Sequence, residues 1–188
     1  MTVFDSLLEA YEEQKHFHEF LESELTPHIA EASTLLVETL NSGHKILTTA
    51  SIDIEAFAAQ TSKDLLQCSD FERPSFASMH IPFIENPHAE LPTQTLAPAT
   101  SALMNKGDCV ILLASQQSEA ALLEVIELCK ASKNPYILIC NVSNQTLINA
   151  ASDLSVCIPI PDSRFCKFHY YIISIILETI EKSIFEFV

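Results

Sequence analysis

The chain has 188 residues, of which 48% are hydrophobic, so it has the size of one domain with a sizeable core. It carries 25 acidic and 10 basic residues, for a formal net charge of −15, and the basic residues are scattered. Direct binding to nucleic acid is therefore not expected, whereas a solvated surface or a basic protein partner is compatible with this charge. The only glycines are Gly43 and Gly107, which excludes the glycine-rich phosphate loops of Walker and Rossmann type.

The cysteines and the N-terminus predict a cytoplasmic location. Six cysteines form no C-x-x-C pair, and several lie inside apolar runs, as is typical of reduced core thiols. The N-terminus lacks the basic start and long apolar core of a signal peptide. The most apolar helical stretch, residues 170–177, is too short to span a bilayer, so no membrane association is expected.

Two helices are predicted before the first strand. Residues 3–24 have apolar side chains at helical spacing, with acidic side chains on the opposite face. Thr26 and Pro27 form a restart signal, an N-cap followed by proline in the first turn. Gly43 suits the left-handed end of a second helix that runs to about Asn41.

The rest of the chain alternates strands and helices, which predicts an α/β fold. Strands are expected at 44–50, 75–81, 109–115, 135–141 and 154–160, and helices at 52–67, 118–133, 145–151 and 164–186. Because the strands are apolar on both faces, we expect a mostly parallel five-stranded sheet covered by helices on both sides. Residues 82–106 contain four prolines and predict an irregular connection with one helix at its end.

The final helix is apolar on more than one face, and a single sheet can cover only one stripe of it. This surplus predicts burial against another subunit, with the N-terminal helices joining the same bundle. We therefore expect a homo-oligomer, either a dimer or a tetramer.

The expected turn between the strand 109–115 and the next helix belongs to a strand–turn–helix arrangement that often binds phosphate. Backbone N–H groups and the helix dipole favour a negative charge at such a helix start. This turn has no glycine, however, and Glu119 places a carboxylate in the first helical turn, with Ser118 as the expected N-cap. If a phosphate bound about 4 Å from that carboxylate, at an effective dielectric near 20, repulsion between each pair of unit charges would weaken binding by roughly 4 kcal/mol.

Several spaced motifs resemble the SIS (sugar isomerase) domain family. They are KIL at 45–47, TTASIDI at 48–54, ERPS at 72–75 and GDCVILLASQQSE at 107–119. The similarity runs from about Leu35 to the end and lies closest to the branch that holds phosphoheptose isomerases and DiaA, the DnaA initiator-associating protein. It implies one SIS domain over 1–188, a three-layer flavodoxin-like or Rossmann-like sandwich. Within this domain, the resemblance implies that a helical pair at 1–43 forms the oligomer contact and that residues 44–188 form the α/β core with its long C-terminal helix.

The resemblance also implies where a phosphosugar would bind. The family's glycine-rich turn falls on residues 50–53, which contain no glycine. The hydroxyl positions that hold phosphate in the isomerases fall on Ala114, Ser115, Gln116 and Glu119. Only one of these hydroxyls is present, so the resemblance implies a degenerate phosphate site.

The family's metal and acid–base positions fall on Gln60, Asp64, Cys166 and Ser174, and only Asp64 keeps its chemical type. His169 lies at a family histidine position, with a packed helix histidine as the alternative. Proton transfer between sugar carbons needs a base and a conjugate acid, so we expect no catalytic residue, no metal and no cofactor. The vestigial pocket would comprise Ser51, Asp53, Gln60, Asp64, Ser115, Gln116, Ser118, Glu119, Cys166 and His169.

The resemblance therefore implies a non-catalytic, DiaA-like scaffold that binds proteins. Its partner would be the initiator DnaA, in the regulation of chromosome replication initiation. Ile184 and Phe185 match a leucine-phenylalanine pair implicated in assembly and initiator contact in DiaA; packing of Phe185 against the chain's own first helix is the alternative. Two other functions remain open: a phosphoheptose (sedoheptulose 7-phosphate) isomerase, and a regulator that binds sugar phosphates.

Overall fold

The computed structural model describes residues 2–67, 72–85, 94–115, 117, 119–161 and 166–185, with residues 166 and 167 described by their backbone alone. At the centre lies a five-stranded sheet with the strand order β2-β1-β5-β6-β7. All of its strand pairs are parallel. The strands are β1 (Ile46–Ala50), β2 (Ser78–His80), β5 (Cys109–Ala114), β6 (Tyr136–Asn141) and β7 (Ser155–Ile160).

The burial of each strand follows from its place in the sheet. Every residue of β1, β5 and β6 is buried, because helices cover both faces of the sheet there. β7 lies at the edge and alternates between buried and half-buried residues. Pro159 fits this edge position, since proline lacks the N–H that an inner strand would donate.

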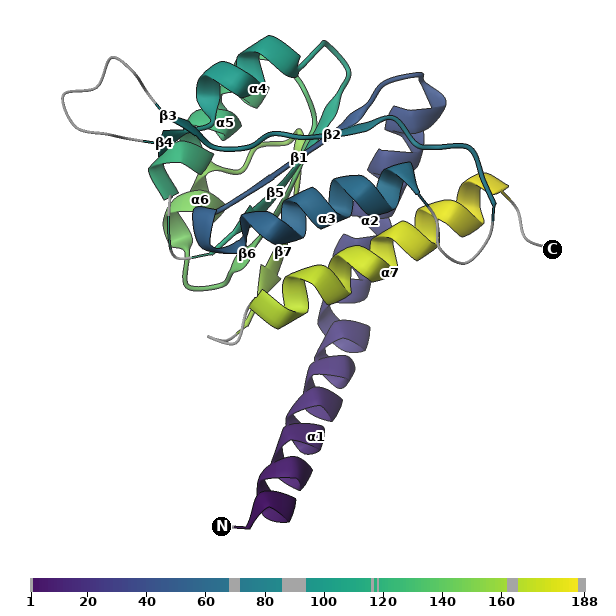
Figure 1. The fold of residues 1–188 in the computed structure, drawn as a ribbon, viewed down its shortest axis with the longest axis vertical. Coiled ribbons are helices and arrows are strands. Elements are labelled where there is room, and N and C mark those ends of the chain that lie inside the picture. The colour runs from purple at the N-terminus through teal and green to yellow at the C-terminus, as the bar shows by residue number, and fades with distance from the viewer. Residues whose placement is uncertain are drawn as a thin grey trace.

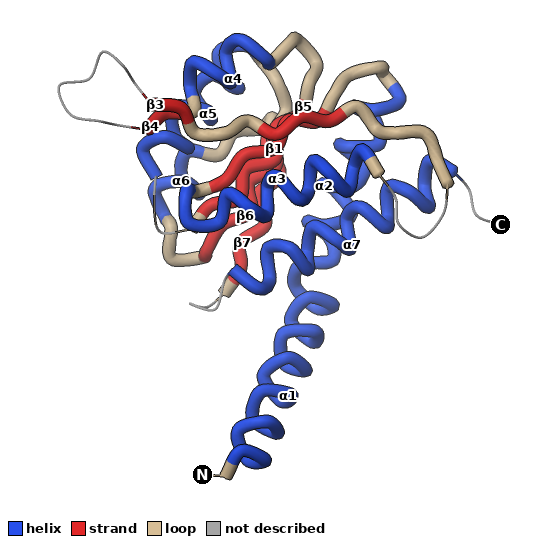
Figure 2. Tube along the Cα trace, in the orientation of Figure 1, coloured by secondary structure: helices blue, strands red, loops and turns tan. Residues whose placement is uncertain are grey.

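Helices form a layer on each face of the sheet, as the fold class predicted (Figures 1 and 2). One layer contains α2 (Thr26–Asn41), α3 (Glu55–Leu66) and α7 (Cys166–Phe185). The other contains α4 (Ala97–Leu103), α5 (Glu119–Ser132) and α6 (Gln145–Ala150). Each layer closes one hydrophobic cluster against the sheet, so the expected three-layer α/β sandwich is confirmed.

The N-terminal helices join differently from the prediction. α1 (Val3–Phe20) continues through one π-helical turn, Leu21–Leu25, directly into α2. The residue before α2, Leu25, is itself helical and fully buried, so the expected N-cap at Thr26 does not form. Thr26 instead donates its hydroxyl back to the carbonyls of Leu21 and Glu22. The π turn accommodates Pro27, which has no N–H to donate, without breaking the helix.

Local differences occur around the first crossover. A 3₁₀ turn, Ile52–Ile54, precedes α3, and β2 covers only three residues of the predicted strand. The 82–106 connection has the predicted helix, α4, and adds a two-stranded hairpin of β3 (Ile84–Glu85) and β4 (Gln94–Thr95). Such two-residue strands are too short to leave a periodic sequence pattern.

Part of the apolar surface of α7 is buried within the chain. α7 packs against both α2 and α3, and its fully buried residues are His169, Ile172, Ile173, Ile176 and Ile180. Within the chain, α2 and α3 therefore cover part of the surface that was expected to pack against another subunit, and burial of the rest by a second copy stays a prediction. Apolar exposure is concentrated instead on α1, which extends away from the α/β body (Figure 1). Among the described helices, none has the length and apolarity to cross a membrane.

Candidate ligand site at the carboxyl ends of β1 and β5

The two turns that the sequence singled out lie side by side. Ala50 and Leu113 are paired at the ends of β1 and β5, so the turns that follow meet at the carboxyl edge of the sheet. Ser51 N–H donates to the Leu113 carbonyl at 2.8 Å, and Ser115 N–H donates to Ser51 Oγ at 2.9 Å. In open parallel sheets this edge is where ligands bind.

Asp53 supplies an internal anion to this turn. Ser115 Oγ donates to Asp53 Oδ1 at 2.6 Å and accepts from Gln117 N–H at 3.0 Å. Ser115 is buried, and its single O–H donor is already used by a group of the chain itself. A carboxylate therefore receives the hydroxyl that a bound phosphate would otherwise use.

Glu119 places a second carboxylate at the same edge. It is the first residue of α5, as predicted, and is half-buried. A carboxylate there stabilises the helix start by about 0.3 to 1 kcal/mol through the dipole, and it repels a phosphate. Gln116 and the predicted N-cap Ser118 lie outside the described residues.

A second group of polar residues gathers between α3 and α7. Gln60 Nε2 donates to Asp64 Oδ1, and Tyr170 Oη donates to Asp64 Oδ2, both at 2.6 Å. The hydrogen bond to Asp64, followed by burial, raises the pKa of Tyr170 to about 12. Both oxygens of Asp64 are therefore engaged within the chain. Among the described residues there is no group of three or more His, Cys, Asp or Glu side chains placed to hold a metal ion.

Tyr170 escaped the sequence analysis because the family positions fell on its helix neighbours. Of those neighbours, His169 is fully buried, and Ser174 is exposed and donates to the Tyr171 carbonyl. For Cys166 only the backbone is described, at the start of α7. The ring stacking of Phe57 on Tyr170 could not be read from spacing, because the two residues lie on different helices.

Glu55 and His80 form a further polar pair beside the site, which the sequence analysis also missed. His80 Nε2 lies 3.4 Å from Glu55 Oε1, and His80 Nδ1 lies 3.1 Å from the Thr48 carbonyl. Glu55 also accepts from Phe83 N–H at 3.1 Å, which ties the connection after β2 to the start of α3. A histidine at the end of a predicted strand was the available signal for this pair.

Ile184 and Phe185, the predicted partner residues, are half-buried at the end of α7. Both pack against the hydrophobic cluster that α2, α3 and α7 form with the sheet. The Phe185 ring stacks on Phe76 with centroids 5.7 Å apart. Phe185 thus contacts its own chain, at Phe76 before β2.

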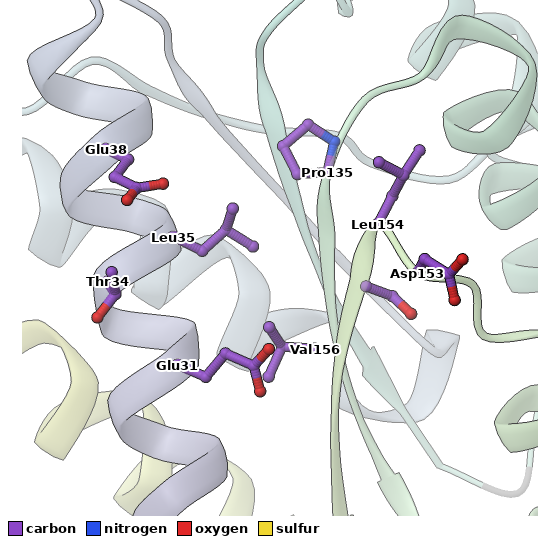
Figure 3. A pocket seen from close by; sticks show the side chains of 9 residues that line it. Glu31, Thr34, Leu35, Glu38, Pro135, Asp153, Leu154 and Val156 are labelled. Carbon is purple, nitrogen blue, oxygen red and sulfur yellow. The ribbon is translucent and has the colours of Figure 1, made fainter.

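A separate hollow lies at the opposite, amino end of the sheet. It has a volume of about 400 Å³ and lies between α2 and the start of β7 (Figure 3). Leu35, Leu154 and Val156 give it an apolar lining, and Glu31, Glu38 and Asp153 add carboxylates. Its place, remote from the Ser51 and Ser115 turns, separates it from the candidate ligand site.

The parallel sheet, its two helical layers and the paired turns at its carboxyl edge define a three-layer α/β protein of the sugar-isomerase type. The chain belongs to the SIS domain family, whose model matches residues 75–179. Among curated proteins, none matches the sequence.

Solved structures agree with the fold over nearly the whole chain. A phosphoheptose isomerase from Francisella tularensis superimposes with a TM-score of 0.80 at 17% identity, covering 97% of this chain and 100% of the isomerase. The phosphoheptose isomerase GmhA from Neisseria gonorrhoeae gives 0.71 at 15% identity, covering 96% and 100%. An Escherichia coli CFT073 protein, solved as a complex with a ligand, gives 0.58 at 16% identity, covering 97% and 93%. At these identities the likeness establishes a phosphoheptose isomerase-like fold.

Proposed function

We propose that this chain is a non-catalytic, cytoplasmic SIS-domain homo-oligomer that acts as a protein-binding scaffold. The observation that carries the proposal is the hydrogen bond from Ser115 to Asp53, because it fills the anion-binding turn with a carboxylate of the chain itself. Glu119 adds a second negative charge at the same edge. A sugar phosphate would have to displace the first carboxylate and approach the second.

The second polar group supports the same proposal. Isomerisation needs a base and a conjugate acid on opposite sides of the sugar. Asp64 is the only carboxylate among the implied acid–base positions, and it accepts hydrogen bonds from Gln60 and Tyr170. Its hydrogen bonds favour a structural role that joins α3 to α7.

A sugar-phosphate isomerase, or a regulator that binds sugar phosphates, is the second candidate function. It is favoured by the structural neighbours, two of which are phosphoheptose isomerases. This candidate requires Asp53 to release Ser115 when ligand binds. The two functions therefore differ in a measurable property, the affinity for a sugar phosphate.

Calorimetry with sedoheptulose 7-phosphate, together with an isomerase assay, separates the two candidates. We expect no turnover of sedoheptulose 7-phosphate above a heat-inactivated control. We also expect no dissociation constant below about 100 micromolar, which corresponds to a free energy of binding of roughly −5.5 kcal/mol. Glu119→Ser should also fail to bind, because Asp53 still occupies Ser115. The Francisella tularensis isomerase serves as the positive control. Turnover or tighter binding by the unmodified protein would establish the second candidate.

The oligomer would form through the helical pair at 1–43. Phe4, Leu7, Leu8 and Tyr11 of α1 are 66%, 45%, 47% and 57% exposed, although they share a helical spacing typical of a buried stripe. A second copy of the chain is a suitable cover, because each copy presents the same apolar helix to the other. Exposed apolar area of this kind is uncommon on monomeric proteins.

The proposed partner is the initiator DnaA, by resemblance to DiaA. The hollow between α2 and β7 suits a protein segment that carries both aliphatic and basic side chains. In Figure 3, Glu31 and Leu35 point from α2 toward the strand, and Asp153 lies on the far side. Among the described residues that line the hollow, three are acidic and none is basic, which favours a cationic segment electrostatically.

Charge reversal in the hollow tests this partner. Binding of purified DnaA to the unmodified protein should weaken at least about tenfold in Glu38→Lys, because a repulsive charge replaces an attractive one. Glu85→Lys on β3 reverses an exposed charge away from the hollow and should leave the affinity unchanged. Equal losses in the two variants would indicate a nonspecific charge effect, and no binding by the unmodified protein would exclude DnaA as the partner.

A further inference from the structure

Two thiols face each other across the last strand pair of the sheet. Cys140 of β6 and Cys157 of β7 have sulfur atoms 3.9 Å apart. Leu138 is aligned with Cys157, and Cys140 with Pro159, so the two cysteines are offset by two residues. Residues two apart in a strand share a face, which places both thiols on the face covered by α5 and α6.

The two thiols differ in their access to solvent. Cys140 is fully buried in the hydrophobic cluster beneath α5 and α6, whereas Cys157 is half-buried on the edge strand. β7 pairs with the sheet on one side only. A small oxidant can therefore reach Cys157, and the edge strand can shift without breaking a second ladder.

Their contact also makes the two thiols chemically unequal. The hydrogen bond between the sulfurs lowers the pKa of Cys157, since Cys140 donates to its thiolate. The same contact, together with burial, raises the pKa of Cys140. Cys157 is the better nucleophile of the pair at neutral pH, because the thiolate is the reactive form.

We propose that Cys157 and Cys140 form a hydroperoxide-sensitive disulfide site at the edge of the sheet. The Cys157 thiolate attacks the terminal oxygen of the hydroperoxide and the O–O bond breaks, so that Cys157 is oxidised to a sulfenic acid. The other oxygen leaves with the bonding electrons and takes up a proton, which gives an alcohol or water. The Cys140 sulfur then attacks the Cys157 sulfur, loses its proton and releases water as the S–S bond forms. The sulfur separation must close from 3.9 Å to about 2.05 Å, by side-chain rotation and a shift of β7.

The chain contains its own control. Cys109 and Cys129 are both fully buried, in the interior of the fold. Burial raises the pKa of Cys129 to about 12 and that of Cys109 above its usual range. These two thiols should stay reduced under conditions in which Cys157 reacts.

Peptide mapping of the intact protein after treatment with hydrogen peroxide tests the proposal. The expected product is one disulfide per chain between Cys140 and Cys157, reversed by dithiothreitol, with Cys109 and Cys129 still open to alkylation after unfolding. Cys157→Ser is the matched variant, because it changes a half-buried side chain by one atom. It should leave Cys140 reduced, and its circular dichroism should match that of the unmodified protein.

Three results would overturn the proposal. One is conversion of Cys157 to a sulfinic acid while Cys140 remains a free thiol. Another is oxidation of Cys109 and Cys129 at the same rate, which would mean that unfolding exposes every thiol. The third is disulfide formation by Cys140 in the Cys157→Ser variant, which would assign the reaction to another cysteine.

Discussion

Ser115 joins the two turns of the candidate site through three hydrogen bonds, with Ser51, Asp53 and Gln117. Ser115→Ala removes the hydroxyl that Asp53 and Gln117 share, so the unfolding free energy should fall by about 1 to 2 kcal/mol. This free energy of unfolding is measured by urea denaturation, with circular dichroism as the signal. Ser132→Ala is the control, since Ser132 is an exposed helix serine that donates to the Leu128 carbonyl, and it should change stability by less than about 0.5 kcal/mol. Equal values for the two variants would mean that the Ser115 network is not structural.

Tyr170 gives a second test at this scale, through pH. Its pKa is about 12 in the folded chain because it donates to Asp64, against an ordinary value near 10. The folded state therefore holds the phenolic proton more tightly, so the stabilisation is complete below pH 10 and is lost as pH rises to about 12. Tyrosinate absorbance should show one tyrosine titrating near pH 12 that is absent from Tyr170→Phe. A difference titration near pH 10 would contradict the hydrogen bond to Asp64.

Among the elements, α1 depends on a few contacts near its C-terminal end. Phe17 is the only buried residue of α1, and its ring stacks on Phe168 of α7 with centroids 3.5 Å apart. Phe17→Ala should loosen the helix, so the amide hydrogens of residues 3–20 exchange faster while those of the sheet are unchanged. Hydrogen exchange with mass spectrometry resolves the two regions. Leu66→Ala, at an exposed apolar site on α3, should leave α1 protection intact; unchanged protection in Phe17→Ala would show that α1 is held elsewhere.

The elements were also what the sequence predicted best. Buried strands and long helices leave strong hydrophobic patterns, and so β1, β5, β6, β7 and the main helices were found. The π turn before Thr26 was not found, because Thr26 and Pro27 have the sequence pattern of a helix start, and only the buried Leu21 and Leu25 show that the helix continues through this point. The hydrogen bond between Asp53 and Ser115 was equally hidden, since the two residues are 62 positions apart and meet only through the pairing of β1 with β5. The motif positions indicated which residues lie at the carboxyl edge of the sheet, but not which of them form hydrogen bonds with one another.

For the whole molecule, the open question is what covers the exposed stripe on α1. Phe4, Leu7, Leu8 and Tyr11 remain accessible although α7, on which the predicted surplus rested, is packed within the chain. We expect light scattering at micromolar concentration to give a dimer or tetramer. The double variant Phe4→Glu, Leu8→Glu should shift the measured mass toward that of the monomer, because it would bury two carboxylates without partners in the interface between copies. Val142→Glu, a single exposed apolar position after β6, should leave the mass unchanged. A strictly monomeric unmodified protein would contradict the assembly and leave the stripe on α1 for a different partner.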